Sequence, residues 1–371
     1  MWSVAGLSST AALAAAAGGA SWYYASRLTE PPADLVVAEP EATDLVEVVE
    51  VAPDSVVLDG PDAARPGAWG LDQLATSGGY VRIDDVAEVD GERVRRRAHH
   101  LVDGFAPGAA RIDGYAWPPL GDTLDPPARE ITYQSGVGPA PAWFVDGHSD
   151  TWVIGVHGRA AHRHEGFRFV PTIARRDHPV LLISYRNDRD APRSPDNRSH
   201  LGHTEWLDVE AAIDHAVAHG ARDVVLVGYS MGGACVVQCV RQSDRAHRVK
   251  GLVLEAPVLD WGPVVRRAAL DRGLPRLVLP ALLPLAMAVA RARVGIDFGA
   301  LRSDPAALDL PTLLIHGDAD PVVPVELSDA LAAARPDVVT YLRVPGAGHV
   351  RAWNTAVDHV ELALGAFLEN L

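Results

Sequence analysis

The chain has 371 residues, of which 48% are hydrophobic, so it can bury a large core, and its length alone suggests two or three domains. Its formal net charge is −15, with 48 acidic against 33 basic residues. Such an average field repels phosphates, so these values argue against a nucleic-acid partner.

The first segment is uncharged and rich in alanine and glycine. No charged side chain occurs from Val4 to Tyr24, and the run ends in aromatic residues, which favour membrane interfaces. Because about 20 apolar residues span a bilayer, residues 1–28 are predicted to be an anchor, with membrane association through residues 1–26 and its side left open. The alternatives are a signal peptide, which would lack its basic n-region, or a helix of a secreted or cytoplasmic protein.

Residues 29–130 form an acidic segment rich in proline and glycine, without helical periodicity. The strand-like runs in it are Leu45–Val51, Ser55–Leu58, Tyr80–Ile83 and Arg93–Arg97. They predict either a small β-rich accessory domain or an extended wrap around the core. The segment is too short for a β-propeller, whose blades need about 40 residues each.

Residues 131–371 alternate between apolar runs and helical patterns. Ile131–Ser135 and Ala142–Val145 are predicted as antiparallel opening strands. A parallel series then follows, with strands at Trp152, Val180, Val224, Gly251, Thr312 and Val339. Helical segments such as 205–218 and 353–368 alternate with these strands, which predicts an α/β fold with a mostly parallel, doubly covered sheet.

An excursion over about 258–308 interrupts this alternation and is predicted to be a helical cap. Its centre, Leu277–Ala290, is apolar apart from two prolines and too short to span a membrane. It would line an acyl pocket, touch a lipid surface or simply pack on the core. Arginines flank it at positions 266, 267, 272, 276, 291 and 293.

The sequence Gly228-Tyr229-Ser230-Met231-Gly232 follows an apolar strand and precedes a helical pattern. It is typical of a nucleophile elbow, in which a serine occupies a strained turn that only small neighbours tolerate. A serine hydroxyl needs a histidine to take its proton and a carboxylate to hold that histidine. Ser230 is therefore the candidate nucleophile.

Both partners follow the ends of later strands. His316 to Pro324 form a turn with two carboxylates, Asp318 and Asp320, and a glycine-rich loop ends in His349. A further strand runs into His157-Gly158-Arg159. The order serine, aspartate, histidine is the one that α/β-hydrolases use.

Over residues 131–371 these motifs resemble the serine α/β-hydrolases. The resemblance implies Asp320 as the acid, with Asp318 as a turn-capping residue and Asp260 as a further candidate. It also implies an oxyanion hole formed by the backbone N–H groups of Arg159 and Met231, each worth about 3 kcal/mol of barrier. The Arg159 side chain departs from the family pattern and would be free to meet an anionic substrate group.

The resemblance implies a serine hydrolase that cleaves carboxylic esters through an acyl-enzyme, acting on a small-molecule ester or a lipid-like substrate. The alternatives are a peptidase similar to the prolyl oligopeptidase group and a non-catalytic binding module. No cofactor and no metal are expected, and the oligomeric state is not predicted.

Three other groups of side chains have structural interpretations. Cys235 and Cys239 are four residues apart on a predicted helix, which suits packing in the core and not a disulfide. The cluster His162-Arg163-His164-Glu165 lacks the spacing of a helical zinc site and is predicted to be a solvated loop. The charge run 186–190 is also predicted to be solvated, with Arg186 or Arg189 as substrate contacts in the alternative interpretation.

Overall fold

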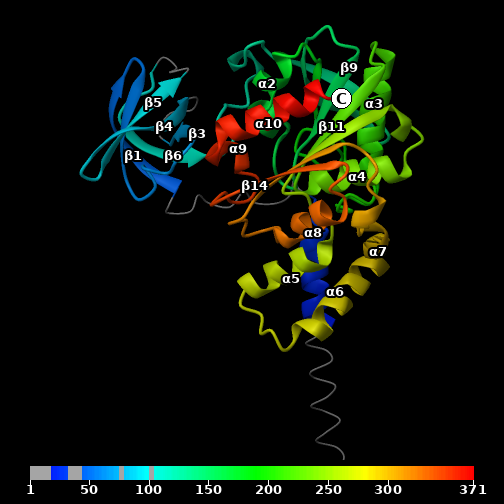
Figure 1. Ribbon diagram of the computed structural model, residues 1–371. Coiled ribbons are helices and arrows are strands. Elements are labelled where there is room, and N and C mark those ends of the chain that lie inside the picture. The colour runs from blue at the N-terminus through cyan, green and yellow to red at the C-terminus, as the bar shows by residue number, and fades with distance from the viewer. Residues whose placement is uncertain (1–17, 32–43, 75–78, 100–103) are drawn as a thin grey trace, which may run out of the picture.

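The computed structural model describes residues 18–31, 44–74, 79–99 and 104–371. Figure 1 shows a small barrel beside a larger α/β body, from which a group of helices projects. The domain limits predicted from the sequence, 1–28, 29–130 and 131–371, remain predictions.

The barrel confirms the β-rich accessory region, and an extended wrap does not form. Its strands are β1 (Leu45–Ala52), β2 (Ser55–Asp59), β3 (Trp69–Gln73), β4 (Tyr80–Asp90), β5 (Arg93–His99) and β6 (Gly108–Asp113). They close in the order β1-β2-β5-β4-β3-β6 around a core that includes Val48, Leu58 and Ile83. Strands β3 and β6 were not among the predicted runs.

The α/β body contains one eight-stranded sheet. Its strands are β7 (Arg129–Ser135), β8 (Gly138–Val145), β9 (Thr151–Val156), β10 (Val180–Ile183), β11 (Asp223–Tyr229), β12 (Val249–Glu255), β13 (Thr312–Gly317) and β14 (Val339–Val344). The order is β14-β13-β12-β11-β9-β10-β8-β7. Only β8 pairs antiparallel with both of its neighbours, so the predicted mostly parallel sheet is confirmed.

Helices cover both faces of this sheet, because successive side chains of a buried strand point to opposite sides. On β11, Leu226 packs with α3 (Trp206–Ala218) and α4 (Met231–Gln242), whereas Val227 packs with α2 (Val170–Ala174) and α10 (Val357–Glu369). Helices α8 (Glu326–Ala334) and α9 (Ala352–Thr355) follow β13 and β14. Both faces are therefore buried.

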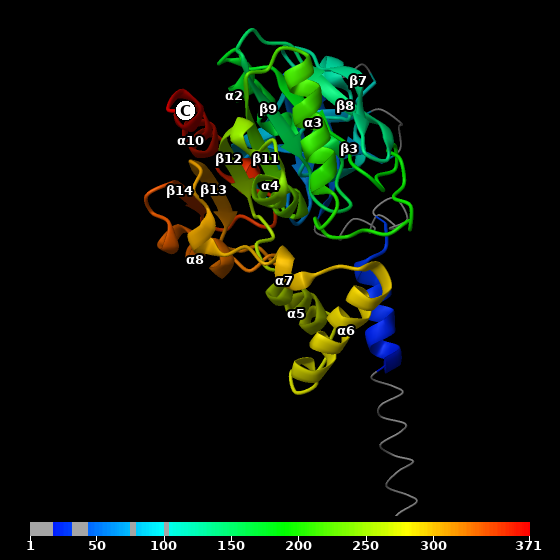
Figure 2. The same cartoon turned by 90° about the vertical axis from the view of Figure 1, so that its right-hand side faces the viewer.

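The excursion after β12 is helical. It comprises α5 (Trp261–Asp271), α6 (Leu279–Val294) and α7 (Phe298–Leu301), which project from the body in Figure 1 and, from the side, in Figure 2. In α6 only Leu279, Ala286 and Ala290 are buried, while Leu277 just before it is 94% exposed. Few side chains of α6 are therefore buried where the cap contacts the rest of the protein.

The predicted membrane anchor is wrong, and the membrane localisation inferred from it falls with it. Within the described ranges, no helix has both the length and the hydropathy needed to cross a bilayer. Residues 18–28 form a helix that packs on the protein: Ser21 and Ala25 are buried, and the Arg293 guanidinium of α6 lies 3.8 Å from the Trp22 ring centroid. The remainder of the predicted segment, residues 1–17, lies outside the described residues.

Candidate active site

Ser230 stands at the turn between β11 and α4, as the elbow motif predicts. Its backbone has φ 52° and ψ −115°, a conformation that L-residues rarely adopt. A Cβ at Gly228 would lie 2.7 Å from Gly233, and one at Gly232 would lie 2.0 Å from the Val156 carbonyl oxygen. Only glycine fits at these two positions, which explains the motif.

The side chains of Ser230, His349 and Asp320 meet. His349 Nε2 lies 2.9 Å from Ser230 Oγ, and His349 Nδ1 lies 2.7 Å from Asp320 Oδ2. Ser230 and Asp320 are buried, and the imidazole of His349 is 21% exposed. Residues that are 119 and 29 positions apart along the chain thus form one hydrogen-bonded row.

The environment of Asp320 keeps its carboxylate ionised. Burial alone would raise its pKa, but hydrogen bonds from His316 and His349, the charge of His349 and a backbone N–H lower the pKa well below the ordinary value of 3.8. Oδ1 accepts from the amides of Val322 and Val323 at 2.7 and 2.9 Å. The second histidine, His316, lies 3.2 Å from Oδ2 and was not assigned a role from the sequence, although it opens the same turn.

The other two acids considered for this role lie elsewhere. Asp318 Oδ1 accepts a hydrogen bond from the Gly346 amide at 2.7 Å, which links the two loops across a sequence separation of 28 residues. Asp260 caps α5 by accepting from the Gly262 amide, and it lies 3.4 Å from Arg302. Neither carboxylate is hydrogen-bonded to His349.

The amides of Arg159 and Met231 flank the serine. Met231 is the first residue of α4, so its N–H has no acceptor within the helix. The Arg159 amide donates to no described residue, and a Cβ at the preceding Gly158 would lie 3.2 Å from Ser230 Cβ. Neither N–H therefore donates to a residue of the described ranges, and both belong to segments in contact with or adjacent to Ser230.

Buried side chains hold the loop that carries Arg159 in place. His157 Nε2 lies 2.9 Å from Asp188 Oδ2, and its Nδ1 lies 2.8 Å from the Gly158 carbonyl oxygen. Tyr185 OH donates to the carbonyl oxygens of His157 and Gly158 at 3.2 Å. Both ring nitrogens of His157 face acceptors. Burial alone would lower the pKa of His157, but the charge and hydrogen bond of Asp188 and the hydrogen bond to Gly158 raise it above its ordinary value.

The predicted solvation of the 186–190 run is therefore wrong over its first half. Arg186, Asn187 and Asp188 are buried, and Arg186 donates to both carboxylate oxygens of Asp208 at 2.7 and 3.0 Å. Asp208, the carboxylate that pairs with Arg186, does not belong to this run but lies on α3. Arg189 is exposed.

The 162–165 cluster is likewise not a solvated loop, because Arg163, His164 and Glu165 are all buried. Glu165 Oε2 accepts from the Gly158 amide at 3.1 Å, so this carboxylate also holds the loop before Arg159. Among the described residues no group of three or more histidine, cysteine, aspartate or glutamate side chains is arranged to hold a metal ion.

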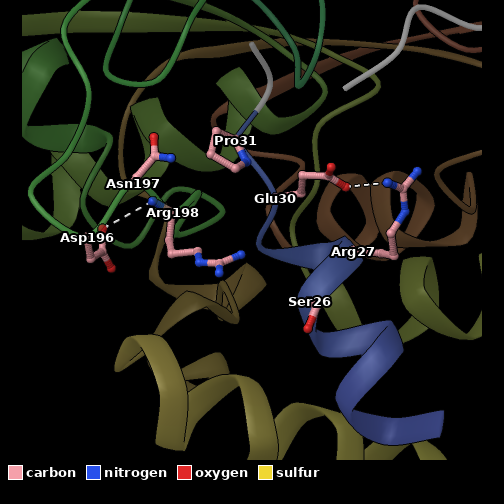
Figure 3. Close-up of a pocket in the computed structure, with 7 residues that line it drawn as sticks. All are labelled: Ser26, Arg27, Glu30, Pro31, Asp196, Asn197 and Arg198. Carbon is pink, nitrogen blue, oxygen red and sulfur yellow. Dashed lines mark hydrogen bonds and ion pairs between the residues drawn. The ribbon is translucent and has the colours of Figure 1, made fainter. Parts of the chain in front are cut away.

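The Arg159 side chain turns away from the serine toward the helix of residues 18–28. Its Nη2 donates to the carbonyl oxygens of Arg27 and Glu30, each at 3.1 Å. Next to this junction is a pocket of about 350 Å³, between the end of that helix and the loop at Asp196 to Arg198, shown in Figure 3. The lining of this pocket includes neither Ser230 nor His349. The Arg159 side chain is thus engaged through Nη2 by the chain itself.

Two family profiles match the chain. The profile of the Alpha/beta hydrolase family covers residues 153–360, more than half of the chain, and that of a domain of unknown function, DUF8805, covers residues 47–113. The second match corresponds to most of the barrel.

Curated relatives are distant in sequence. The chain is 24% identical over 215 residues to the uncharacterized protein YfhR of Salmonella typhimurium, a match that covers 54% of this chain and 65% of that protein. It is 25% identical over 239 residues to the uncharacterized protein MT2364 of Mycobacterium tuberculosis, covering 62% and 75% of the two chains. The chain therefore spans just under two thirds of the length of the YfhR protein.

Among solved structures, the esterase Pf2001 of Pyrococcus furiosus superposes with a TM-score of 0.53 at 18% identity, covering 68% of this chain and 94% of that one. At this identity the likeness concerns the fold. This similarity in fold is consistent with the order of the eight strands and with the match to the family profile. The chain therefore belongs to the alpha/beta hydrolase family.

Proposed function

We propose that the protein is a serine hydrolase that cleaves carboxylic esters through an acyl-enzyme. The observation that carries the proposal is the row of hydrogen bonds from Ser230 through His349 to Asp320, at 2.9 and 2.7 Å. These distances lie within the range for proton transfer between a nucleophile and a general base.

In the first half-reaction, His349 Nε2 takes the hydroxyl proton as Ser230 Oγ attacks the ester carbonyl carbon. The charge that develops on the carbonyl oxygen is received by the amides of Arg159 and Met231, each worth about 3 kcal/mol of barrier. His349 then returns the proton to the departing alcohol oxygen, which leaves the acyl group on Ser230. Asp320 holds the imidazole in the required tautomer and stabilises its cation.

In the second half-reaction, His349 takes a proton from water, and the resulting hydroxide attacks the acyl carbon. The tetrahedral intermediate again places its negative oxygen between the two amides. Its collapse releases the carboxylic acid and returns the proton to Ser230 Oγ. The cycle consumes one water and needs no cofactor.

The test is the Ser230→Ala variant with p-nitrophenyl acyl esters. We expect turnover to fall by at least about 10⁴-fold, because removal of the nucleophile eliminates the covalent route. Ser243→Ala is the matched control, since Ser243 lies at the other end of α4 and is hydrogen-bonded to Glu210. Turnover by Ser230→Ala at the rate of the control would refute the proposal.

A fluorophosphonate probe separates this proposal from a binding module. An activated Ser230 forms a stable adduct that Ser230→Ala lacks, whereas a serine in an inactive scaffold does not react. An aminoacyl amide compared with the acyl ester of matched size tests the peptidase alternative. Faster cleavage of the amide would favour that alternative.

A further inference from the structure

A second pocket lies between the cap and the loop that carries Asp320. It has a volume of about 570 Å³ and lies at the junction of α5 and the start of α8. Figure 1 shows α5 directly below α8 at this junction. The residues that line it are Pro263, Arg266, Arg267, Leu270, Asp271, Arg276, Pro324, Glu326 and Leu327.

Both walls of this pocket are formed by segments that lie close in sequence to residues contacting the proposed triad. On the cap side, α5 begins three residues after Val258, whose amide donates to the Ser230 carbonyl oxygen at 3.0 Å. On the core side, Pro324 lies in the turn whose amides hold Asp320 Oδ1. The two walls of the pocket are therefore continuous with the segments that hold Ser230 and Asp320.

The cationic side chains of the pocket lack partners. Arg266, Arg267 and Arg276 form no hydrogen bond and no ion pair with any residue in the described ranges. Other arginines of the cap are engaged: Arg291 lies 3.6 Å from Asp297, and Arg302 lies 3.4 Å from Asp260. Unpaired guanidinium groups that share one pocket are suited to a carboxylate or phosphate.

This local charge opposes that of the whole chain. Residues 258–308 contain seven arginines and four aspartates, whereas the formal net charge of the protein is −15. Asp271 and Glu326 also line the pocket, so its lining keeps a small positive excess. On this count of charges, an anionic ligand is favoured at the cap relative to the average field of the chain.

The rest of the lining is apolar. Leu270 of α5 and Leu327 of α8 face the pocket together with Pro263 and Pro324. Aliphatic side chains near guanidinium groups fit a ligand with an apolar chain and an acidic end. Burial of each methylene of such a chain is worth roughly 0.8 kcal/mol.

We propose that this pocket binds the acidic end of the substrate, so that the preferred esters carry an anionic group at the far end of an apolar acyl chain. The inference rests on the proposed esterase function and specifies its substrate class. The ester carbonyl lies at Ser230, the methylene chain follows the junction of cap and core, and Arg266, Arg267 and Arg276 bind the terminal anion.

The experiment compares mono-p-nitrophenyl esters of adipic, suberic and sebacic acid with neutral p-nitrophenyl esters of equal chain length. The readout is the ratio of kcat/KM for the anionic ester to that for its neutral partner, after subtraction of the rate with Ser230→Ala. We expect the wild-type ratio to exceed one, to depend on chain length and to fall as salt is added, since salt screens the attraction.

The triple variant Arg266→Gln, Arg267→Gln, Arg276→Gln should lower this ratio by about tenfold or more, which corresponds to 1.4 kcal/mol. Arg272→Gln is the matched control, because Arg272 ends the same helix but bonds to the Ala268 carbonyl oxygen and does not line the pocket. The control should keep the wild-type ratio.

An unchanged ratio in the triple variant, or an equal fall in Arg272→Gln, would overturn the inference. If the triple variant does not fold, the three single variants and the salt dependence of the wild type decide, and a wild-type ratio of one or below also overturns it. Absence of any Ser230-dependent turnover of the neutral esters would instead refute the esterase proposal, so the two failures are distinguishable.

Discussion

At the scale of single residues, the site depends on which carboxylate faces His349. Asp320 and Asp318 are two positions apart in one turn, yet only Asp320 has a carboxylate oxygen within 2.7 Å of the imidazole. Asp318 instead accepts from the Gly346 amide. Asp318 and Asp320 have the same side chain and lie in the same turn, so variants of the two residues differ mainly in the contact with His349 that is lost.

We predict that Asp320→Asn lowers kcat for p-nitrophenyl esters by about 10⁴-fold, because the amide favours the wrong tautomer of the histidine. Asp318→Asn should lower kcat by less than about tenfold, since it weakens one loop contact. Steady-state kinetics of the two variants decide. Equal losses in both would contradict the assignment of Asp320.

The buried pair His157–Asp188 predicts a pH dependence of stability. Burial alone would lower the pKa of His157, but the charge and hydrogen bond of Asp188 and the Gly158 carbonyl raise it above 6.5. A raised folded-state pKa means that the stabilisation is complete below the unfolded value and is lost as the pH rises through the folded value. Glu165 also contributes to the raised pKa.

The free energy of unfolding of wild type should therefore exceed that of Asp188→Asn by about 3–5 kcal/mol at a pH below the ordinary histidine pKa of 6.5, and the difference should narrow as the pH rises above it. Urea denaturation at several pH values measures it. Asp214→Asn, which removes an exposed ion pair with Arg245, should give a small difference that does not change over this range. A constant difference for Asp188→Asn would contradict the prediction.

At the scale of elements, the helix of residues 18–28 is held between the cap and the loop that carries Arg159. Arg293 of α6 stacks on Trp22 and donates a hydrogen bond to Ser26 Oγ, while Arg159 donates to the carbonyl oxygens of Arg27 and Glu30. The Ser199 amide adds a bond to the Thr29 carbonyl oxygen at 3.0 Å. Polar contacts therefore fix the end of a helix whose aromatic face is half exposed.

We predict that Arg293→Gln increases hydrogen exchange of residues 18–31 by about 5- to 30-fold, because a cation–π contact of about 1–2 kcal/mol is lost. Hydrogen exchange read by mass spectrometry measures this locally. Arg291→Gln is the control, since Arg291 pairs with Asp297 on the cap. Unchanged exchange in Arg293→Gln, or an equal increase in both variants, would contradict the prediction.

At the scale of the whole molecule, the barrel and the α/β body are joined through Asn354 of α9. Its Nδ2 donates to the carbonyl oxygens of Ala68 and Gly114 at 2.8 and 3.0 Å, and its Oδ1 accepts from Arg168 at 3.1 Å. Arg168 is fully buried and lies 3.8 Å from Glu165 and 4.0 Å from Glu255. One amide thus connects the barrel to the ionic cluster beneath the elbow.

Asn354→Ala should lower the free energy of unfolding by about 2–4 kcal/mol, because it leaves buried carbonyl groups and a guanidinium without partners. Urea unfolding, followed by far-UV circular dichroism, measures the loss. Thr355→Ala is the neighbouring control and should cost less, since Thr355 bonds within its own helix to the Arg351 carbonyl oxygen. An equal cost for both variants would contradict this role of Asn354.

The sequence predicts the sheet and the meeting of Ser230, Asp320 and His349 well, because each motif follows an apolar strand and the carboxyl ends of parallel strands share one edge. The same reasoning misses β3 and β6. These strands contain Gly70 and Gly108, and they are stabilised by closure of the barrel between distant segments. Such pairing leaves little trace in a local pattern.

Buried charge is the second kind of feature that the sequence does not reveal. Arg163 and Arg186 were predicted to be solvated, yet their carboxylate partners Glu130 and Asp208 lie 33 and 22 residues away. A charge run indicates solvent exposure only when no such partner exists. The prediction of a membrane anchor is wrong for a related reason. Composition gives the hydropathy of residues 18–28, but it does not show that Ser21 and Ala25 are buried against the protein.

The only two thiols of the chain, Cys235 and Cys239, lie on α4 just behind the serine, and both are completely buried. Burial raises the pKa of Cys239 to about 12 and that of Cys235 well above its usual range, so neither forms a thiolate at neutral pH in the native state. A chromogenic disulfide reagent added to the native protein therefore has no accessible thiol until α4 separates from the sheet. The rate of its reaction with the two cysteines would therefore measure how often the α/β body opens around α4.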